Sequence, residues 1–171
     1  LTYVPGTFRD WNHPRVIVHL TSTDLKNWDY QSTLKLVNEK VIDASIEVHR
    51  NLGGPGLLEG VYEAALCHEL LLKGISSHKQ LPVQVLYKGV VVREPLYLDI
   101  VIGNEMVIEV KATAKDYAFY QAQLFTYLRL TGIKLGLLVN FGKKDVRLGI
   151  SRIMNDQKNS EFLETSRLPS F

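Results

Sequence analysis

The chain has 171 residues, of which 46% are hydrophobic and 22% are charged, a composition typical of one ordinary globular domain. Its net charge of +2 permits nucleic-acid binding without arguing for it, so any basic binding surface must be local. The single cysteine, Cys67, excludes an internal disulfide framework and favours a reducing compartment, so we expect a cytoplasmic protein. No apolar run approaches the ~18–20 residues of a membrane span, and the N-terminus lacks a secretory signal pattern, so no membrane contact is expected.

The first readable element is a helix, which follows an extension of unknown role at residues 1–31. From Ser32 onward apolar residues recur at steps of three and four, which predicts an amphipathic helix over 32–51. The run Asn51-Leu-Gly-Gly-Pro-Gly56 then ends it, because two glycines and a proline do not continue a helix.

A second helix is predicted over 57–73, where Glu59, Tyr62 and Glu63 fall on one stripe. Taken alone, the two glutamates suit a solvated first turn, since the helix dipole favours acidic side chains there. On the sequence pattern this structural interpretation is preferred to a functional one.

Four short strand segments come next, arranged as two hairpins. Segments 83–87 and 90–93 are joined by a Lys-Gly turn, and segments 97–102 and 106–111 by Gly-Asn-Glu. Pro95 is expected to separate the hairpins, because proline suits strand starts and edges.

The second hairpin carries a polar patch whose meaning depends on its register. A three-residue loop at 103–105 would pair Ile102 with Met106 and place Asp99 opposite Glu109. A two-residue loop would instead separate the two carboxylates; we predict the three-residue loop. Side-chain alternation would then give one wholly apolar face, made of Leu98, Ile100, Ile102, Met106, Ile108 and Val110.

The C-terminal half contributes one helix and two strands. A helix over 116–130 places Gln123 and Tyr127 four residues apart, so an amide and a phenol can reach the same spot. The apolar run at 136–142 is typical of a buried strand, and 146–150 is predicted as a short final strand before a polar tail at 154–171.

On the other hairpin face, Asp99, Glu109 and Lys111 suit metal-dependent phosphodiester chemistry. Two carboxylates bind Mg²⁺ through hard oxygen ligands, and a nearby ammonium can orient a water or stabilise developing charge. The alternative is a set of surface ion pairs with Lys111 or Arg93, worth ~0–1 kcal/mol. The hairpin alone does not decide between them.

The neighbouring motifs resemble a family named for its GxxExxY signature, which stands here as Gly56-Leu-Leu-Glu59-Gly-Val-Tyr62. The resemblance extends over roughly residues 34–152, although one glycine more precedes the motif than the family usually has. The similar blocks occur in the family's order: IEVHRNLGGPGLLEGVYEAAL, LPVQVLYKGVVV, YLDIVIGNEMVIEVKA, QAQLFTYLRLTG and GLLVNFG.

That family belongs to the PD-(D/E)XK nuclease superfamily, which implies an α/β (α+β) fold for residues 32–153. The expected core is restriction-endonuclease-like, a mixed central β-sheet flanked by helices in the order αα-ββββ-α-ββ, and the predicted elements agree with it.

The resemblance also implies a catalytic metal site for Mg²⁺ or Mn²⁺. Asp99, Glu109 and the Val110 carbonyl would hold the metal, and Glu59 would complete or extend the set of ligands. Leu98 stands where the signature has its proline. The implied activity is hydrolysis of a nucleic-acid phosphodiester, with DNA as the expected substrate.

Further residues complete the implied site. Lys111 would position the attacking water, while Gln123 and Tyr127 would contact the nucleotide or support Lys111. His49 is expected to be structural. Basic side chains available for phosphate contacts are Lys115, Arg129, Lys143, Lys144 and Arg147.

Two other functions stay open. A fold does not establish a function, so the chain can be a non-catalytic module that binds nucleic acid or protein. It can also be a small subunit that acts only within an oligomer, and self-association is compatible with the sequence.

Overall fold

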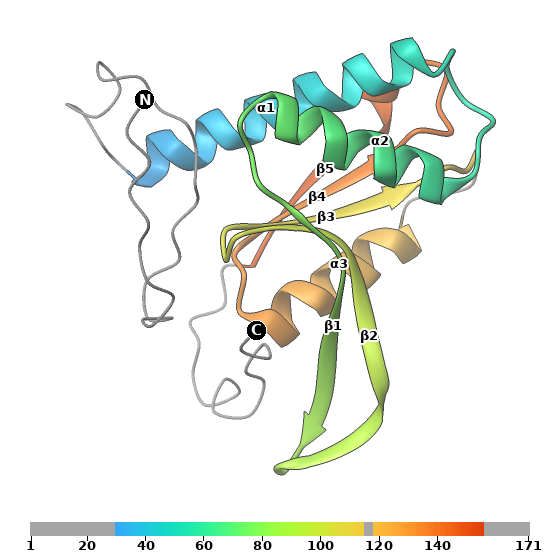
Figure 1. The fold of residues 1–171 in the computed structure, drawn as a ribbon. Helices are drawn as coiled ribbons and strands as arrows, with labels where there is room; N and C mark the ends of the chain where they lie inside the picture. The colour runs from blue at the N-terminus through green and yellow to red at the C-terminus, as the bar shows by residue number, and fades with distance from the viewer. Residues whose placement is uncertain (1–29, 115–117, 156–171) are drawn as a thin grey trace.

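Three helices and one sheet form the fold, over the residues that the computed structural model describes, 30–114 and 118–155. Helices α1 (Tyr30–Asn51) and α2 (Glu59–Leu72) lie on one face of the sheet, and α3 (Ala118–Thr131) lies on the other (Figure 1). The expected α+β class is confirmed.

The sheet has five strands in the order β1-β2-β3-β4-β5. Neighbouring strands are antiparallel except β3 and β4, which are parallel and joined by a crossover through α3. The strands are β1 (His78–Tyr87), β2 (Val90–Ile102), β3 (Met106–Lys111), β4 (Leu135–Asn140) and β5 (Ile150–Met154).

The helices form where apolar side chains recur with helical spacing. On α1 the residues at this spacing, Val37, Val41, Ala44 and Val48, are buried against α2 and the upper face of the sheet. The α3 helix buries a separate cluster on the lower face. Two apolar cores therefore hold β3 and β4 between them, and all residues of these two strands are buried.

The two predicted segments on either side of Pro95 are one continuous strand, β2, so the expectation that proline separates them is wrong. The ladder between β1 and β2 shifts register at this point, since Val83 pairs with Leu96 but Val85 pairs with Arg93. Pro95 falls in the extra length of β2 at this bulge, a position that tolerates a residue without an N–H donor.

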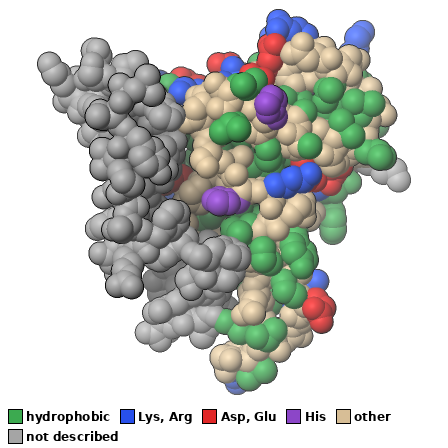
Figure 2. All heavy atoms as spheres, viewed as in Figure 1, with side chains coloured by type: hydrophobic (Ala, Val, Ile, Leu, Met, Phe, Trp, Pro, Cys, Tyr) green, Lys and Arg blue, Asp and Glu red, His purple; other side chains and the backbone are tan. Residues whose placement is uncertain are grey.

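The outer part of β1 and β2 forms a bent arm that extends away from the helices (Figure 1). Apolar side chains are visible along it in Figure 2, and Tyr87, Val90, Val91 and Val92 are each more than half exposed. The inner parts of both strands contribute to the cores, β1 through Val83.

Two local predictions need correction. Residues 146–150 were expected to be a strand, but Val146–Gly149 is a 3₁₀ turn, η2, and the strand begins at Ile150. Leu98 was expected beside Ile100 on one face, yet the two side chains pack in different cores, so the side chains of β2 do not alternate regularly between them.

Most of the predicted extension at 1–31 and tail at 154–171 lies outside the described residues. Within 30–114 and 118–155, no helix combines the length and apolar character needed to cross a bilayer.

Candidate active site

The predicted register of the polar hairpin is confirmed, with Ile102 paired to Met106 across a three-residue loop. The ladder between β2 and β3 runs as far as Ile100 opposite Ile108. Beyond that pair, the Asp99 carboxylate accepts a hydrogen bond from the Val110 N–H at 2.9 Å. The side chain of Asp99 is thus tied to β3 where the ladder ends.

Lys111 is the centre of the group. Its Nζ lies 2.8 Å from Glu109 Oε1, 3.3 Å from Glu59 Oε1 and 3.7 Å from Asp99 Oδ2. It also donates to the Val110 carbonyl at 2.8 Å. The four residues predicted to be catalytic therefore meet around one ammonium, which both Asp99 and Glu109 contact.

Burial makes this arrangement electrostatically costly. Asp99, Glu109 and Lys111 are 8%, 0% and 7% exposed, whereas the Glu59 side chain, at the start of α2, is 41% exposed. Three carboxylates around one ammonium leave a surplus of negative charge where little water can screen it. The group therefore favours an additional cation.

The pKa values of these groups show the same effect. Burial, then Asp99, raises the pKa of Glu109 to about 7. Burial also raises the pKa of Asp99 and that of Glu59 above their usual values. For Lys111, burial alone would lower the pKa, but Glu109, Asp99 and Glu59 outweigh it and raise it.

The donor set fits a divalent cation. Glu109 Oε2 is buried and accepts no hydrogen bond from any described residue, so its lone pairs are available to a ligand. The nearby carboxylates and the Val110 carbonyl offer hard oxygen atoms, which Mg²⁺ and Mn²⁺ prefer. In addition, carboxylate oxygens of Glu59, Glu63 and Asp99 lie within 4.8 Å of one another.

Helix α3 closes the opposite side of the group. Gln123 donates to the Tyr127 hydroxyl at 2.8 Å, as their four-residue spacing predicts. Burial raises the pKa of Tyr127, and the charges of Glu109 and Asp99 raise it further. The Lys111 ammonium also lies 5.5 Å from the centre of the Tyr120 ring.

Comparison with known protein families gives one match. The profile of the PD-(D/E)XK nuclease superfamily matches residues 35–153. The chain belongs to this superfamily. No curated protein and no solved structure matched the chain.

The superfamily domain accounts for the fold and for a nuclease-type site. Membership in the GxxExxY family, with its Glu59 and Tyr62, stays a prediction, as do the individual roles of the site residues. Of the predicted phosphate contacts, Lys115 lies outside the described residues, and Arg129 lies in the last turn of α3.

Two further polar residues, Glu63 and Gln80, lie beside Asp99, and the sequence prediction did not assign them to the site. Glu63 is 5% exposed and is bound by Lys79 Nζ at 3.2 Å. The Gln80 amide nitrogen donates to Glu63 at 3.0 Å and to Asp99 at 3.3 Å, so its two hydrogens bridge two carboxylates. Gln80 has a φ of 55°, uncommon for a residue other than glycine.

One of these residues left a signal in the sequence. Glu63 is four residues after Glu59, which puts both carboxylates on one side of a helix. The sequence carries no such signal for Gln80, because its left-handed backbone and its bridge between the two carboxylates depend on where α2 lies over the edge strand.

Tyr62, three residues after Glu59, holds the loop that leads into α2. Its hydroxyl donates to the Gly54 carbonyl at 2.7 Å and accepts from the Leu57 N–H at 3.3 Å. Its ring stacks on Phe141, with centroids 4.6 Å apart. Tyr62 thereby fixes the loop that leads into α2 and with it the start of the helix that carries Glu59.

Asn140 secures the segment that leaves the site after Lys111. It is fully buried and donates to the Thr113 carbonyl at 2.8 Å, while its Oδ1 accepts from the N–H groups of Thr113 and Gly142 at 3.1 and 2.9 Å. The Phe141 N–H donates to the Lys111 carbonyl at 2.6 Å. The ends of β3 and β4 are therefore held together beside the site.

Proposed function

We propose that the protein is a metal-dependent nuclease that hydrolyses phosphodiester bonds of nucleic acid, with DNA as the expected substrate and Mg²⁺ or Mn²⁺ as the cofactor. The observation that carries the proposal is the buried pair Asp99 and Glu109 around Lys111, with one Glu109 oxygen open to a ligand. Most buried carboxylate oxygens in folded proteins have a hydrogen-bond partner, so the unpartnered Glu109 oxygen beside Asp99 and Lys111 supports a ligand site.

Asp99, Glu109, the Val110 carbonyl and Glu59 would hold the divalent cation. When bound, such a cation polarises the phosphoryl group and makes a water more acidic. Asp99 needs little reorganisation for this role, because the Val110 N–H and the Gln80 amide already orient its carboxylate.

Lys111 would act on the water and on developing negative charge. Its ammonium is held by carboxylates from three elements, so it stays protonated and donates hydrogen bonds from a fixed position. Gln123 and Tyr127 would contact the nucleotide from the α3 side, since their hydrogen bond presents both polar groups at one place.

The test is incubation of the purified protein with single- and double-stranded DNA and RNA, in Mg²⁺, Mn²⁺ or EDTA. We expect cleavage only with metal, and a loss of at least about a hundredfold in Asp99→Asn and in Lys111→Met. Matched controls make the same changes outside the site: Asp43→Asn on the exposed side of α1, and Lys73→Met at the end of α2. Both should retain activity.

Two results would count against the proposal. Binding without cleavage under every metal condition would favour a non-catalytic binding module. Cleavage that persists in both site variants would show that a contaminating nuclease or another site is responsible.

A further inference from the structure

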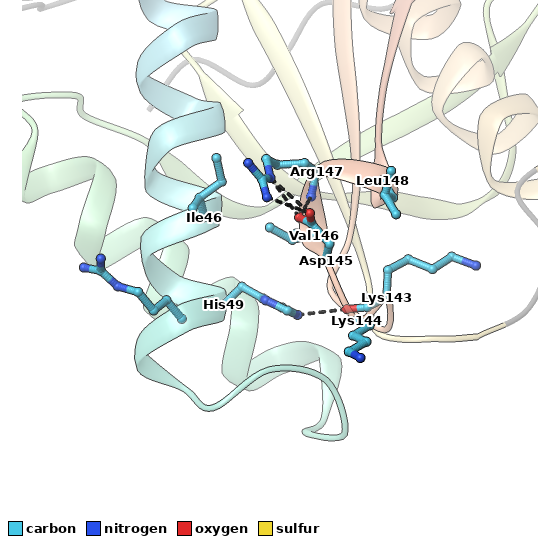
Figure 3. Close-up of a pocket in the computed structure, with 9 residues that line it drawn as sticks. Ile46, His49, Lys143, Lys144, Asp145, Val146, Arg147 and Leu148 are labelled. Atoms are coloured by element: carbon cyan, nitrogen blue, oxygen red, sulfur yellow. Dashed lines mark hydrogen bonds and ion pairs between the residues drawn. The ribbon is translucent and has the colours of Figure 1, made fainter.

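A second polar feature lies outside the cluster around Lys111. A pocket of about 750 Å³ opens between the last turns of α1 and the loop that joins β4 to η2 (Figure 3). Ile46 and Leu148 contribute apolar walls. Its polar lining consists of His49, Arg50, Lys143, Lys144, Asp145 and Arg147.

Positive charge is concentrated here. Four lining residues are permanent cations and only Asp145 is acidic, a surplus of three, although the whole chain carries only +2. Glu47 binds Arg50 at 2.6 Å, and counting it reduces the surplus to two. The pocket is therefore a local basic surface on a chain whose overall charge is close to neutral.

Hydrogen bonds fix the loop that carries these cations. His49 is buried, and its Nε2 donates to the Lys143 carbonyl at 2.9 Å, since a carbonyl only accepts (Figure 3). Asp145 caps η2 through the Arg147 N–H and binds the guanidinium Nε and Nη2 at 3.0 and 2.8 Å. That geometry orients the guanidinium and leaves its Nη1 edge to another partner. Ordering the Arg147 side chain on binding thus costs little entropy.

The pocket lies at the same end of the sheet as the candidate active site. Lys111 and Asn140 are partners at the ends of β3 and β4, and the pocket loop continues from Asn140. Lys143 Nζ lies 3.4 Å from the Ala114 carbonyl, on the segment that leaves Lys111. A polyanion bound at the active site therefore has a fixed group of cations at the same end of the sheet.

We propose that this pocket binds a phosphate group of the nucleic-acid backbone that flanks the cleaved bond. The proposal rests on the proposed nuclease function. Arg147 and Lys144 donate to the phosphate oxygens, as arginine and lysine do in most protein–phosphate contacts. Such contacts position a strand without reading its sequence, which predicts a contribution to affinity that is equal for all sequences.

The experiment measures binding of labelled single- and double-stranded DNA and RNA in EDTA, so that cleavage plays no part. The salt concentration is varied between about 50 and 200 mM, because each phosphate contact adds close to one to the slope of log affinity against log salt. The variants are Lys144→Gln, Arg147→Gln and the charge reversal Lys144→Glu. Lys73→Gln and Lys88→Gln are matched controls, directly after α2 and at the tip of the β1–β2 arm.

We expect each neutral pocket variant to lower the magnitude of the slope by about one, with a several-fold loss of affinity at low salt. Lys144→Glu should lose more, and the controls should match the wild type. Melting temperatures should stay within a few degrees, which separates loss of contact from loss of fold.

Two outcomes would overturn the proposal: pocket variants with the wild-type slope, or no nucleic-acid binding by the wild type. If the variants keep the wild-type slope while inorganic phosphate binds the pocket, the pocket is a site for small anions only. If the wild type cleaves nucleic acid but the pocket variants keep its slope, the pocket proposal is wrong and the nuclease function is supported. If the pocket variants change the slope but the wild type does not cleave, the pocket proposal is supported and the nuclease function is wrong.

Discussion

Replacing Glu109 with glutamine should stabilise the metal-free protein and abolish its metal-dependent activity. The glutamine has nearly the same shape and can still accept a hydrogen bond from Lys111, but it carries no charge. Because Glu109 is fully buried, solvent screening does not reduce the effect of that charge.

The magnitude follows from the pKa of Glu109, which burial and Asp99 raise from 4.5 to about 7. One pKa unit corresponds to about 1.36 kcal/mol, so ionised Glu109 costs the folded state about 3 kcal/mol. The folded protein holds this proton more tightly than the unfolded chain does. Stability should therefore fall as the pH rises from about 4.5 through 7 in the wild type, and this component should be absent from Glu109→Gln.

The assay is thermal or urea unfolding in EDTA at pH 4.5 to 8.5, with the difference between variant and wild type plotted against pH. That difference should grow by about 3 kcal/mol toward high pH, or roughly 6–12 °C in melting temperature for a domain of this size. Glu39→Gln, which makes the same change on the exposed side of α1, is the matched control and should show a much smaller pH-dependent change. A difference for Glu109→Gln that does not vary with pH would refute the reasoning.

Three further variants test other parts of the site. Tyr62→Phe keeps the ring stack but removes the hydroxyl with its two hydrogen bonds, so unfolding measurements should show a loss of about 1–2 kcal/mol and cleavage should fall in parallel. Gly142→Ala would place its Cβ 2.4–2.5 Å from backbone atoms of Thr113 and should cost about 1–3 kcal/mol, whereas Gly60→Ala on α2 has open space and should be neutral or stabilising. Gln80→Met removes the bridge between two carboxylates and should weaken Mn²⁺ binding by about tenfold in calorimetry, while unchanged affinity would show that the bridge is dispensable.

The elements and the central hairpin were accessible from the sequence, because their signals are local. Alternation and the Gly-Asn-Glu loop gave the pairing of Ile102 with Met106, which the structure confirms. The prediction that Pro95 separates the two hairpins was wrong. Whether a proline interrupts a strand depends on the pairing with the neighbouring strand, and here that pairing contains a bulge. The strand predicted at 146–150 failed for a similar reason: Asp145 caps a short 3₁₀ turn that apolar residues alone do not reveal.

In the candidate site, too, the features that the sequence predicts are the local ones. By itself, the sequence determined which chemical groups are present and which lie near one another along a helix or across a hairpin: Asp99 with Glu109, and Gln123 with Tyr127. It also carried the superfamily, whose profile covers most of the chain.

Only the tertiary structure decided how those groups are used. The place of Lys111 among carboxylates from α2, β2 and β3, and the bridge made by Gln80, depend on how a helix packs over a sheet edge. Burial then fixes the energetics, since the same carboxylates at the surface would be weak ion pairs, whereas at Glu109 burial raises the pKa to about 7. Residue types are a property of the chain, but their charge states and partners are properties of the packed molecule.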